Sequence, residues 1–199
     1  MRGVEQIPWL YDALAALAER GEIGRWRRWL TAGAQGRTLD VGTGTGRNLP
    51  LFPAGTFVVA VDPSLSALRR ARRRAPGAAV TAASVEALPF RDGVFDTIVS
   101  SLAFCSVTNP VRGLAEVRRV LHPSGHLRML EHVRSVAPWR ARCQDLIQPA
   151  WTRVMGGCHP NRETERTVVA AGFRIDPAER RARGGLRRFS ARVESDARV

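Results

Sequence analysis

The hydrophobic and polar positions of the chain follow two alternating periods. Short apolar runs are typical of buried strands, and longer segments with apolar positions three or four apart are typical of helices. The pattern predicts a strand that ends just before Gly42 and six more at residues 57–62, 78–83, 95–100, 126–131, 173–175 and 189–193. It predicts helices at residues 65–75, 111–121, 138–155 and 162–171. This alternation implies a doubly wound, Rossmann-like α/β fold with a mostly parallel, seven-stranded sheet.

The N-terminal part of the chain has apolar residues at helical spacing, interrupted once by a glycine-containing stretch. We expect two amphipathic helices over residues 8–30 that form a helical cap on the core fold. The aromatic residues Trp9, Tyr11 and Trp26 either line a ligand pocket beneath this cap or pack the cap onto the sheet.

The first predicted strand runs into three glycines at alternate positions, Gly42, Gly44 and Gly46. Glycines in a turn between a strand and a helix let a ligand approach the backbone, where free N–H groups are exposed. The dinucleotide fingerprint requires its third glycine at position 47, which is Arg47 here. Asp40 favours a cationic ligand such as S-adenosyl-L-methionine, which carries an ammonium and a sulfonium group. The alternative is a glycine-rich turn that binds nothing.

A second acidic residue, Asp62, ends the next predicted strand, 20 residues after Gly42. Ligands of open parallel sheets bind beyond the carboxyl ends of the strands. A carboxylate at that place can accept hydrogen bonds from both hydroxyls of a ribose. The alternative is an ordinary cap of the following helix.

The composition is that of a soluble globular protein, with 44% hydrophobic and 25% charged residues among 199. No window approaches 18 uninterrupted apolar residues, and the sequence does not start like a secretion signal, so we expect a cytoplasmic protein without stable membrane insertion. The formal charge of +13 comes from 31 arginines without any lysine. We interpret this charge as a solvated face or an attraction for an acidic substrate, and we do not expect a nucleic-acid partner.

The three cysteines, Cys105, Cys143 and Cys158, are odd in number and widely spaced. This spacing argues against a disulfide framework and against a Cys-x-x-Cys zinc site. Cys158 and His159 form one adjacent pair without a second pair. The spacing therefore predicts no metal site.

Several linked motifs resemble those of the class I S-adenosylmethionine-dependent methyltransferases. They are LDVGTGTG at 39–46, VDPS at 61–64, EALPF at 86–90, DGVFD at 92–96 and RVLHPSG at 119–125. The resemblance implies the cofactor S-adenosyl-L-methionine, bound by Asp40, Gly42, Thr43, Gly44, Gly46, Asn48, Asp62, Pro63, Ser84, Val85, Glu86, Ser100 and Cys105. Ser84 stands where this family usually has an aspartate that binds the adenine amino group. Either its hydroxyl or the backbone near Val85 then recognises adenine.

The second half of the chain resembles a narrower group, the methyltransferase-like seven alkyl-thiol methyltransferases and their bacterial relatives. The matching segments are SLAFCSV at 101–107, LEHV at 130–133, Trp139, PAW at 149–151, GC at 157–158 and NRE at 161–163. Quinone C-methyltransferases and phosphatidylethanolamine N-methyltransferases are similar more loosely. The resemblance implies methyl transfer to a small molecule, with a thiol as the favoured acceptor and a nitrogen, oxygen or carbon acceptor as the alternative.

A thiol acceptor must lose its proton, and histidine is the usual base near neutral pH. His132 follows the last parallel strand, where it acts either as a base or substrate contact or as a structural hydrogen-bonding group. The substrate side is expected to include Trp9, Tyr11, Glu131 and His159. Competing classes are a nucleotide-dependent oxidoreductase, a nucleic-acid methyltransferase and a cofactor-binding protein without activity.

These predictions divide one domain, residues 1–199, into three parts. Residues 1–35 form the helical cap, residues 36–135 the cofactor-binding core, and residues 136–199 the substrate-side helices and the C-terminal strands. Within the last part, residues 180–188 are a run of arginine and glycine, and the sequence leaves open whether this run is ordered. The oligomeric state is left open.

Overall fold

A computed structural model describes residues 21–155 and 157–194 of the chain. Its strands are β1 (Arg37–Val41), β2 (Phe57–Asp62), β3 (Ala79–Ala82), β4 (Phe95–Ser101), β5 (Leu121–His132), β6 (Phe173–Ile175), β7 (Arg181–Arg183) and β8 (Leu186–Val193). Its helices are α2 (Glu22–Ala32), α3 (Leu65–Arg74), α4 (Pro110–Val120), α5 (Pro138–Val154) and α6 (Thr164–Ala170), with a 3-10 turn at Leu49–Leu51. Each of the predicted strands and helices that falls in the described residues is present; β2 and β6 have the predicted bounds, and the ends of most others are shifted.

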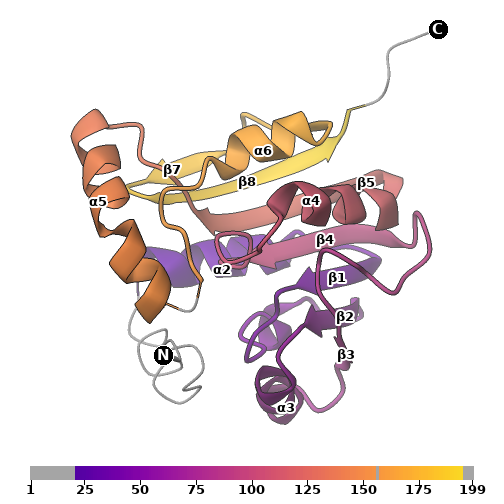
Figure 1. The fold of residues 1–199 in the computed structure, drawn as a ribbon. Coiled ribbons are helices and arrows are strands. Elements are labelled where there is room, and N and C mark those ends of the chain that lie inside the picture. Colours follow the sequence, from indigo (N-terminus) through magenta and orange to yellow (C-terminus); the bar gives the residue numbers. More distant parts are fainter. Residues whose placement is uncertain (1–20, 156, 195–199) are drawn as a thin grey trace, which may run out of the picture.

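The strands form one twisted sheet in the order β3-β2-β1-β4-β5-β8-β6, and β7 pairs with β8 at its side (Figure 1). The pairs among β1 to β5 are parallel, whereas β8 runs antiparallel to β5 and to β6. This sheet confirms the predicted Rossmann-like α/β fold. The strand order reverses between β1 and β4, which is where open α/β sheets bind their ligands.

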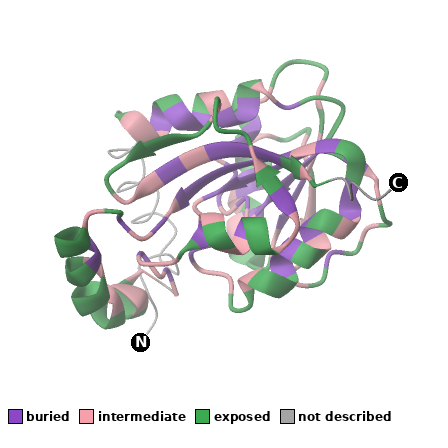
Figure 2. Cartoon of the chain, turned by 90° about the horizontal axis from the view of Figure 1, so that it is seen from above, coloured by how far each residue is buried: buried purple, intermediate pink, exposed green. Residues whose placement is uncertain are grey.

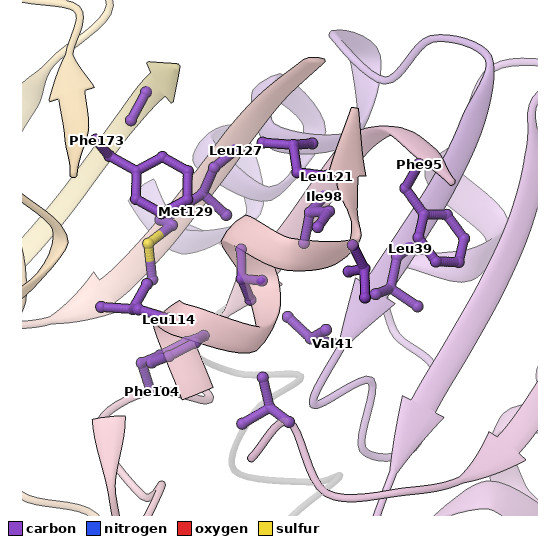
Figure 3. Packing of buried hydrophobic residues seen from close by; sticks show 14 of the residues in the cluster. Leu39, Val41, Phe95, Ile98, Phe104, Leu114, Leu121, Leu127, Met129 and Phe173 are labelled. Carbon is purple, nitrogen blue, oxygen red and sulfur yellow. The ribbon is translucent and has the colours of Figure 1, made fainter. Parts of the chain in front are cut away.

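Helices cover both faces of the sheet. On one face α4 and α6 pack over a cluster that includes Ile98, Leu114 and Met129, all fully buried (Figure 3). On the other face Trp26 and Leu30 of α2 pack against Val99 and Leu130. Burying these side chains contributes about 1.5–3 kcal/mol for each large one, and it anchors α2 to the strands that end at the site.

The helix α5 stands at one end of the sheet and is largely exposed, with Ala141 as its one buried residue (Figure 2). Pro149 lies within it without ending it. In the described part of the chain, none of the helices combines the length and the apolar character needed to cross a membrane.

Within the described residues the sheet has eight strands in place of the predicted seven, and one predicted boundary was wrong. The additional strand is β7, in the segment whose order the sequence left open. It pairs with β8 across the two-residue turn Gly184-Gly185, in which Gly184 has a φ of 56°. Strand β5 begins at Leu121 rather than at residue 126, since the backbone stays extended through Gly125. A Cβ on Gly125 would lie 2.8 Å from the Asp96 carbonyl oxygen, so this close approach needs glycine.

Candidate functional site

The carboxyl ends of β1, β2, β4 and β5 meet at one edge of the sheet. Val41, the last residue of β1, is in register with Ser100 of β4, and Ser100 is in register with Met129 of β5. The segments that follow these strands are therefore neighbours. They bring together most of the candidate residues in the described part of the chain.

The glycine turn follows β1 directly, and its three glycines have positive φ angles of 64°, 54° and 78°. A Cβ on Gly42 would lie 2.3 Å from Cβ of Ala103, and one on Gly46 would lie 2.8 Å from Cα of Ala71. Among residues 21–155 and 157–194, no atom lies within 4 Å of the corresponding position on Gly44. Gly42 and Gly46 are thus required by packing, while Gly44 faces open space in which a ligand can reach the backbone.

Asp40 lies fully buried beneath this turn. Its two carboxylate oxygens accept hydrogen bonds of 2.7 Å from the Thr43 hydroxyl and the Asn48 amide. Asn48 in turn accepts a 2.6 Å hydrogen bond from the Arg27 guanidinium, which also donates to Ser101. Burial raises the pKa of Asp40 to about 6, opposed by these hydrogen bonds and by the Arg27 charge. The network holds a negative charge under the turn and ties α2 to it.

Asp62 stands at the end of β2, facing the same turn. One carboxylate oxygen accepts from the Gly44 backbone N–H at 2.9 Å and the other from the Ser64 N–H at 2.8 Å. Burial raises the pKa of Asp62 above its usual value. A carboxylate offers about four lone pairs, so each oxygen keeps acceptor capacity toward a ligand hydroxyl. Ser64 also caps α3, which is the alternative role that the sequence left open for this segment.

The predicted adenine-binding segment follows β3. The Ser84 hydroxyl is exposed and accepts from the Glu86 N–H at 3.2 Å, whereas the Val85 side chain belongs to the core. The Glu86 carboxylate accepts from the Asn109 N–H at 3.0 Å and so holds the start of α4. Pro63 is exposed beside Asp62. The backbone of this segment is fixed by these bonds at the edge where the turn lies.

Between β4 and α4 a loop is organised around one buried carboxylate, that of Glu131. Glu131 is fully buried and accepts hydrogen bonds from the Ser100 hydroxyl at 2.8 Å and from the backbone N–H groups of Ala103 and Phe104 at 3.2 Å. Burial raises its pKa. The loop begins at Leu102, which has a φ of 56°, a left-handed backbone conformation that residues other than glycine rarely adopt. Glu131 therefore supports the loop from below.

Three ligand-type side chains meet beside this loop. One nitrogen of His132 and the sulfurs of Cys105 and Cys158 lie within 4.8 Å of one another, and the Cys158 sulfur is 4.0 Å from His132 Nδ1. The neighbouring Cys158 thiol, burial and the Glu131 charge raise the pKa of Cys105. The proximity of Cys105 and His132 lowers the pKa of Cys158 against the opposing effect of burial.

Comparison with known proteins assigns the fold and the turn to one family. Residues 39–129 match the family described as a methyltransferase domain. The chain is 34% identical over 152 residues to human thiol S-methyltransferase TMT1A, a match that covers 71% of this chain and 62% of that protein. Residues 39–129 therefore form a methyltransferase domain of this family. It is also 39% identical over 127 residues to the demethylmenaquinone methyltransferase of Renibacterium salmoninarum, with 61% and 53% coverage.

The solved structures agree with this assignment. A Thermotoga maritima S-adenosylmethionine-dependent methyltransferase, described as a possible histamine N-methyltransferase, superposes with a TM-score of 0.74 and 21% identity, covering 96% of this chain and 98% of that one. The comparisons confirm the predicted methyltransferase family and the predicted cofactor, S-adenosyl-L-methionine. The chain spans less than two thirds of the length of the curated relatives named above.

The remaining substrate-side candidates of the methyltransferase lie in different surroundings. His159 donates its backbone N–H to the Cys105 carbonyl at 2.8 Å, and its ring faces Arg162 at 3.4 Å. It thus belongs to the same cluster of loops as His132. Trp9 and Tyr11 lie outside the described residues. Trp26 packs α2 onto the sheet, which confirms the packing alternative for this residue.

Sequence reasoning missed two buried residues of the candidate site. Arg27 is a buried cation, 7% exposed. The sequence feature that could have revealed it is an arginine between Trp26 and Trp29, on the apolar side of a predicted helix. Cys158 was set aside because spacing along the chain cannot show that a loop after α5 folds back onto the loop after β4.

Proposed function

We propose that the protein transfers the methyl group of S-adenosyl-L-methionine to a small-molecule thiol. The observation that carries this proposal is the open space at Gly44, flanked by Asp62 and by the buried charge of Asp40, next to a loop that presents sulfur and imidazole groups. The thiol is favoured because the human relative that is 34% identical is a thiol S-methyltransferase.

The residues around the turn suit the cofactor. Asp62 retains acceptor capacity for the ribose hydroxyls, and the negative charge of Asp40 attracts the ammonium and sulfonium groups. In our assignment the backbone at Val85 and the Ser84 hydroxyl recognise adenine. The proposed cofactor side is completed by the glycine turn and by Thr43, Asn48, Pro63, Glu86, Ser100 and Cys105.

Methyl transfer to a thiol requires alignment more than bond-breaking assistance. Holding the acceptor sulfur in line with the methyl carbon and the sulfonium can supply about 7–11 kcal/mol of the barrier. A thiol with a pKa of about 8.5 is mostly protonated at neutral pH, so the acceptor also needs help to ionise. We assign this help to His132 and its neighbours, with His159 as a substrate contact and Glu131 as the support of the acceptor-side loop.

A second acceptor class has one observation in its favour. The chain is 39% identical to a demethylmenaquinone methyltransferase. The assay that separates the two classes incubates the protein with methyl-labelled S-adenosylmethionine and, in parallel, small alkyl thiols, a demethylated quinol and primary amines. Label transferred to thiols supports the proposal. Label transferred to the quinol and to no thiol contradicts it.

The wider setting follows the same proposal. We take the partner to be a small molecule, the chain to be one domain, and its location to be the cytoplasm. We do not expect nucleic acid to be a partner. RNA binding that weakens steeply as salt rises through the physiological range would contradict this view.

Replacing Gly44 with alanine is expected to weaken cofactor binding at least about tenfold, because a Cβ at this position projects into the open space where the ligand contacts the turn. Gly55 provides the matched control. It also has a positive φ, of 83°, with nothing within 4 Å of the place that a Cβ would take, and it precedes β2 at the opposite edge of the sheet. Both variants should lose about 1–2 kcal/mol of stability. Calorimetric titration should show reduced affinity for S-adenosylhomocysteine in Gly44→Ala alone.

Cofactor affinity should rise about tenfold between about pH 5 and pH 7, the range over which Asp40, with a pKa of about 6, becomes ionised. A bound ammonium group favours the ionised carboxylate, so binding releases a proton below pH 6 and tightens as pH rises. Arg27 and Asp62 are the other charged groups that act on Asp40. Titration with 5′-methylthioadenosine, which lacks the amino-acid portion, should show a smaller pH dependence. An equal pH dependence of affinity for the cofactor and for 5′-methylthioadenosine would show that Asp40 does not act on the ammonium group.

A further inference from the structure

Cys105, His132 and Cys158 come from three segments that are far apart in sequence. Cys105 lies in the loop after β4, His132 ends β5, and Cys158 lies in the loop after α5. Their ligand atoms nevertheless lie within 4.8 Å of one another. Both cysteines are buried and neither forms a disulfide.

This donor set has the composition of a zinc site with an open position. Two thiolates and one imidazole are soft and borderline ligands that favour Zn²⁺ over magnesium or calcium. In tetrahedral geometry, with Zn–S near 2.3 Å and Zn–N near 2.0–2.1 Å, neighbouring ligand atoms are about 3.5–3.8 Å apart. The Cys158 sulfur and His132 Nδ1 are already 4.0 Å apart. The widest separation among the three ligand atoms is within 4.8 Å, so side-chain adjustments of about an ångström bring all three to that spacing.

The backbone around the three residues is held in place by bonds that do not use the ligand atoms. The Cys105 carbonyl accepts from the His159 N–H at 2.8 Å, and the Cys158 carbonyl accepts from the Thr152 hydroxyl at 3.0 Å. The Cys105 N–H points to the Glu131 carboxylate at 3.4 Å. Such outer contacts orient metal ligands and leave their sulfur and nitrogen atoms available.

The cluster also lies close to the glycine turn. Ala103, two residues before Cys105, is the residue that a Cβ on Gly42 would strike at 2.3 Å. The loop that carries Cys105 is therefore in contact with the glycine turn. Three protein ligands leave the fourth position of a tetrahedral ion for a substrate, as in catalytic rather than structural zinc sites.

We propose that Cys105, His132 and Cys158 bind one Zn²⁺ ion whose fourth position receives the acceptor thiol. The second part of this proposal rests on the proposed thiol methylation. The acceptor R–SH binds as its thiolate and its proton leaves to solvent. A sulfur lone pair then forms the bond to the methyl carbon while the carbon–sulfonium bond breaks, which yields R–S–CH₃ and S-adenosylhomocysteine. His132 then serves as a metal ligand and not as the base.

Metal binding is tested on the full-length protein, reduced and stripped with a chelator, then titrated with zinc chloride against a chromophoric chelator. We expect about one zinc per chain, and visible bands of thiolate-bound tetrahedral cobalt when Co²⁺ is used instead. Cys158→Ser and Cys105→Ser should lose the site, whereas Cys143→Ser, at an exposed cysteine of α5, should keep it. Thermal unfolding checks that the variants are folded. The proposal would be overturned if the protein took up no zinc or if Cys158→Ser still bound it. It would also be overturned by a Cys105–Cys158 disulfide in the protein as purified.

The role of the fourth position is tested by comparing the zinc-loaded and zinc-free protein. Removal of zinc should lower the rate of thiol methylation at least about tenfold and leave the affinity for S-adenosylhomocysteine unchanged. Equal thiol methylation by both forms would overturn acceptor binding by the metal while leaving the proposed function intact. Zinc uptake by a protein that methylates no thiol would support the metal site and would instead contradict the proposed function.

Discussion

Replacing Asp62 with alanine is expected to weaken the binding of S-adenosylhomocysteine about 100-fold, or about 2.7 kcal/mol. Hydrogen bonds to a charged group contribute about 1.5–3 kcal/mol each, and our assignment gives Asp62 both ribose hydroxyls. The variant also loses the acceptor of the Gly44 N–H, which helps to fix the turn. Isothermal titration calorimetry measures the change directly.

The control for this variant is Asp176→Ala. Asp176 makes the same local bond as Asp62, since its carboxylate accepts from the N–H two residues later at 2.8 Å, and it lies after β6, near the other end of the sheet. Loss of this bond alone should leave cofactor affinity unchanged. If Asp62→Ala and Asp176→Ala bind the cofactor equally well, Asp62 only holds the Gly44 and Ser64 N–H groups and is not a ribose ligand.

The His132→Ala variant is expected to lose about 100-fold in the rate of thiol methylation while its affinity for S-adenosylhomocysteine stays within about twofold of the original. His132 lies beside Cys158 on the acceptor side and makes none of the described contacts with the glycine turn. The effect should therefore fall on turnover, whether the imidazole acts on the acceptor directly or through a metal ion. Steady-state assays with labelled cofactor give the turnover number.

His122→Ala is the matched control for that experiment. His122 is exposed near the amino end of β5, where it contacts Ser124 at 2.7 Å. Its removal should change neither turnover nor affinity. Unchanged turnover in His132→Ala would show that the acceptor is handled elsewhere.

The fold could be predicted from the sequence because its strands are short apolar runs with clear ends. Phe57–Asp62 is such a run, and Asp62 and Pro63 mark its end. The hairpin of β7 and β8 was missed because Arg181–Arg183 carries no apolar residue larger than alanine, so its pairing depends on backbone hydrogen bonds and on the Gly184-Gly185 turn. A periodicity argument cannot detect a strand without an apolar face.

The meeting of the glycine turn, Asp40 and Asp62 could be predicted as well, since they follow one another at strand ends that a parallel sheet must bring together. The meeting of Cys105 and Cys158 could not. Cys105 and Cys158 are 53 positions apart, and they meet only because the loop after α5 returns to the end of β4. Spacing rules for metal ligands describe sites built from adjacent residues, so they overlook a site assembled by tertiary structure.

The most direct test of the central claim is calorimetric titration of the purified protein with S-adenosylhomocysteine, S-adenosylmethionine and NAD. The account predicts saturable binding of the first two at one site per chain and no binding of NAD, because Arg47 replaces the third glycine of the dinucleotide fingerprint and Asp40 repels a pyrophosphate. Preferential binding of NAD, or no binding of S-adenosylhomocysteine, would contradict it.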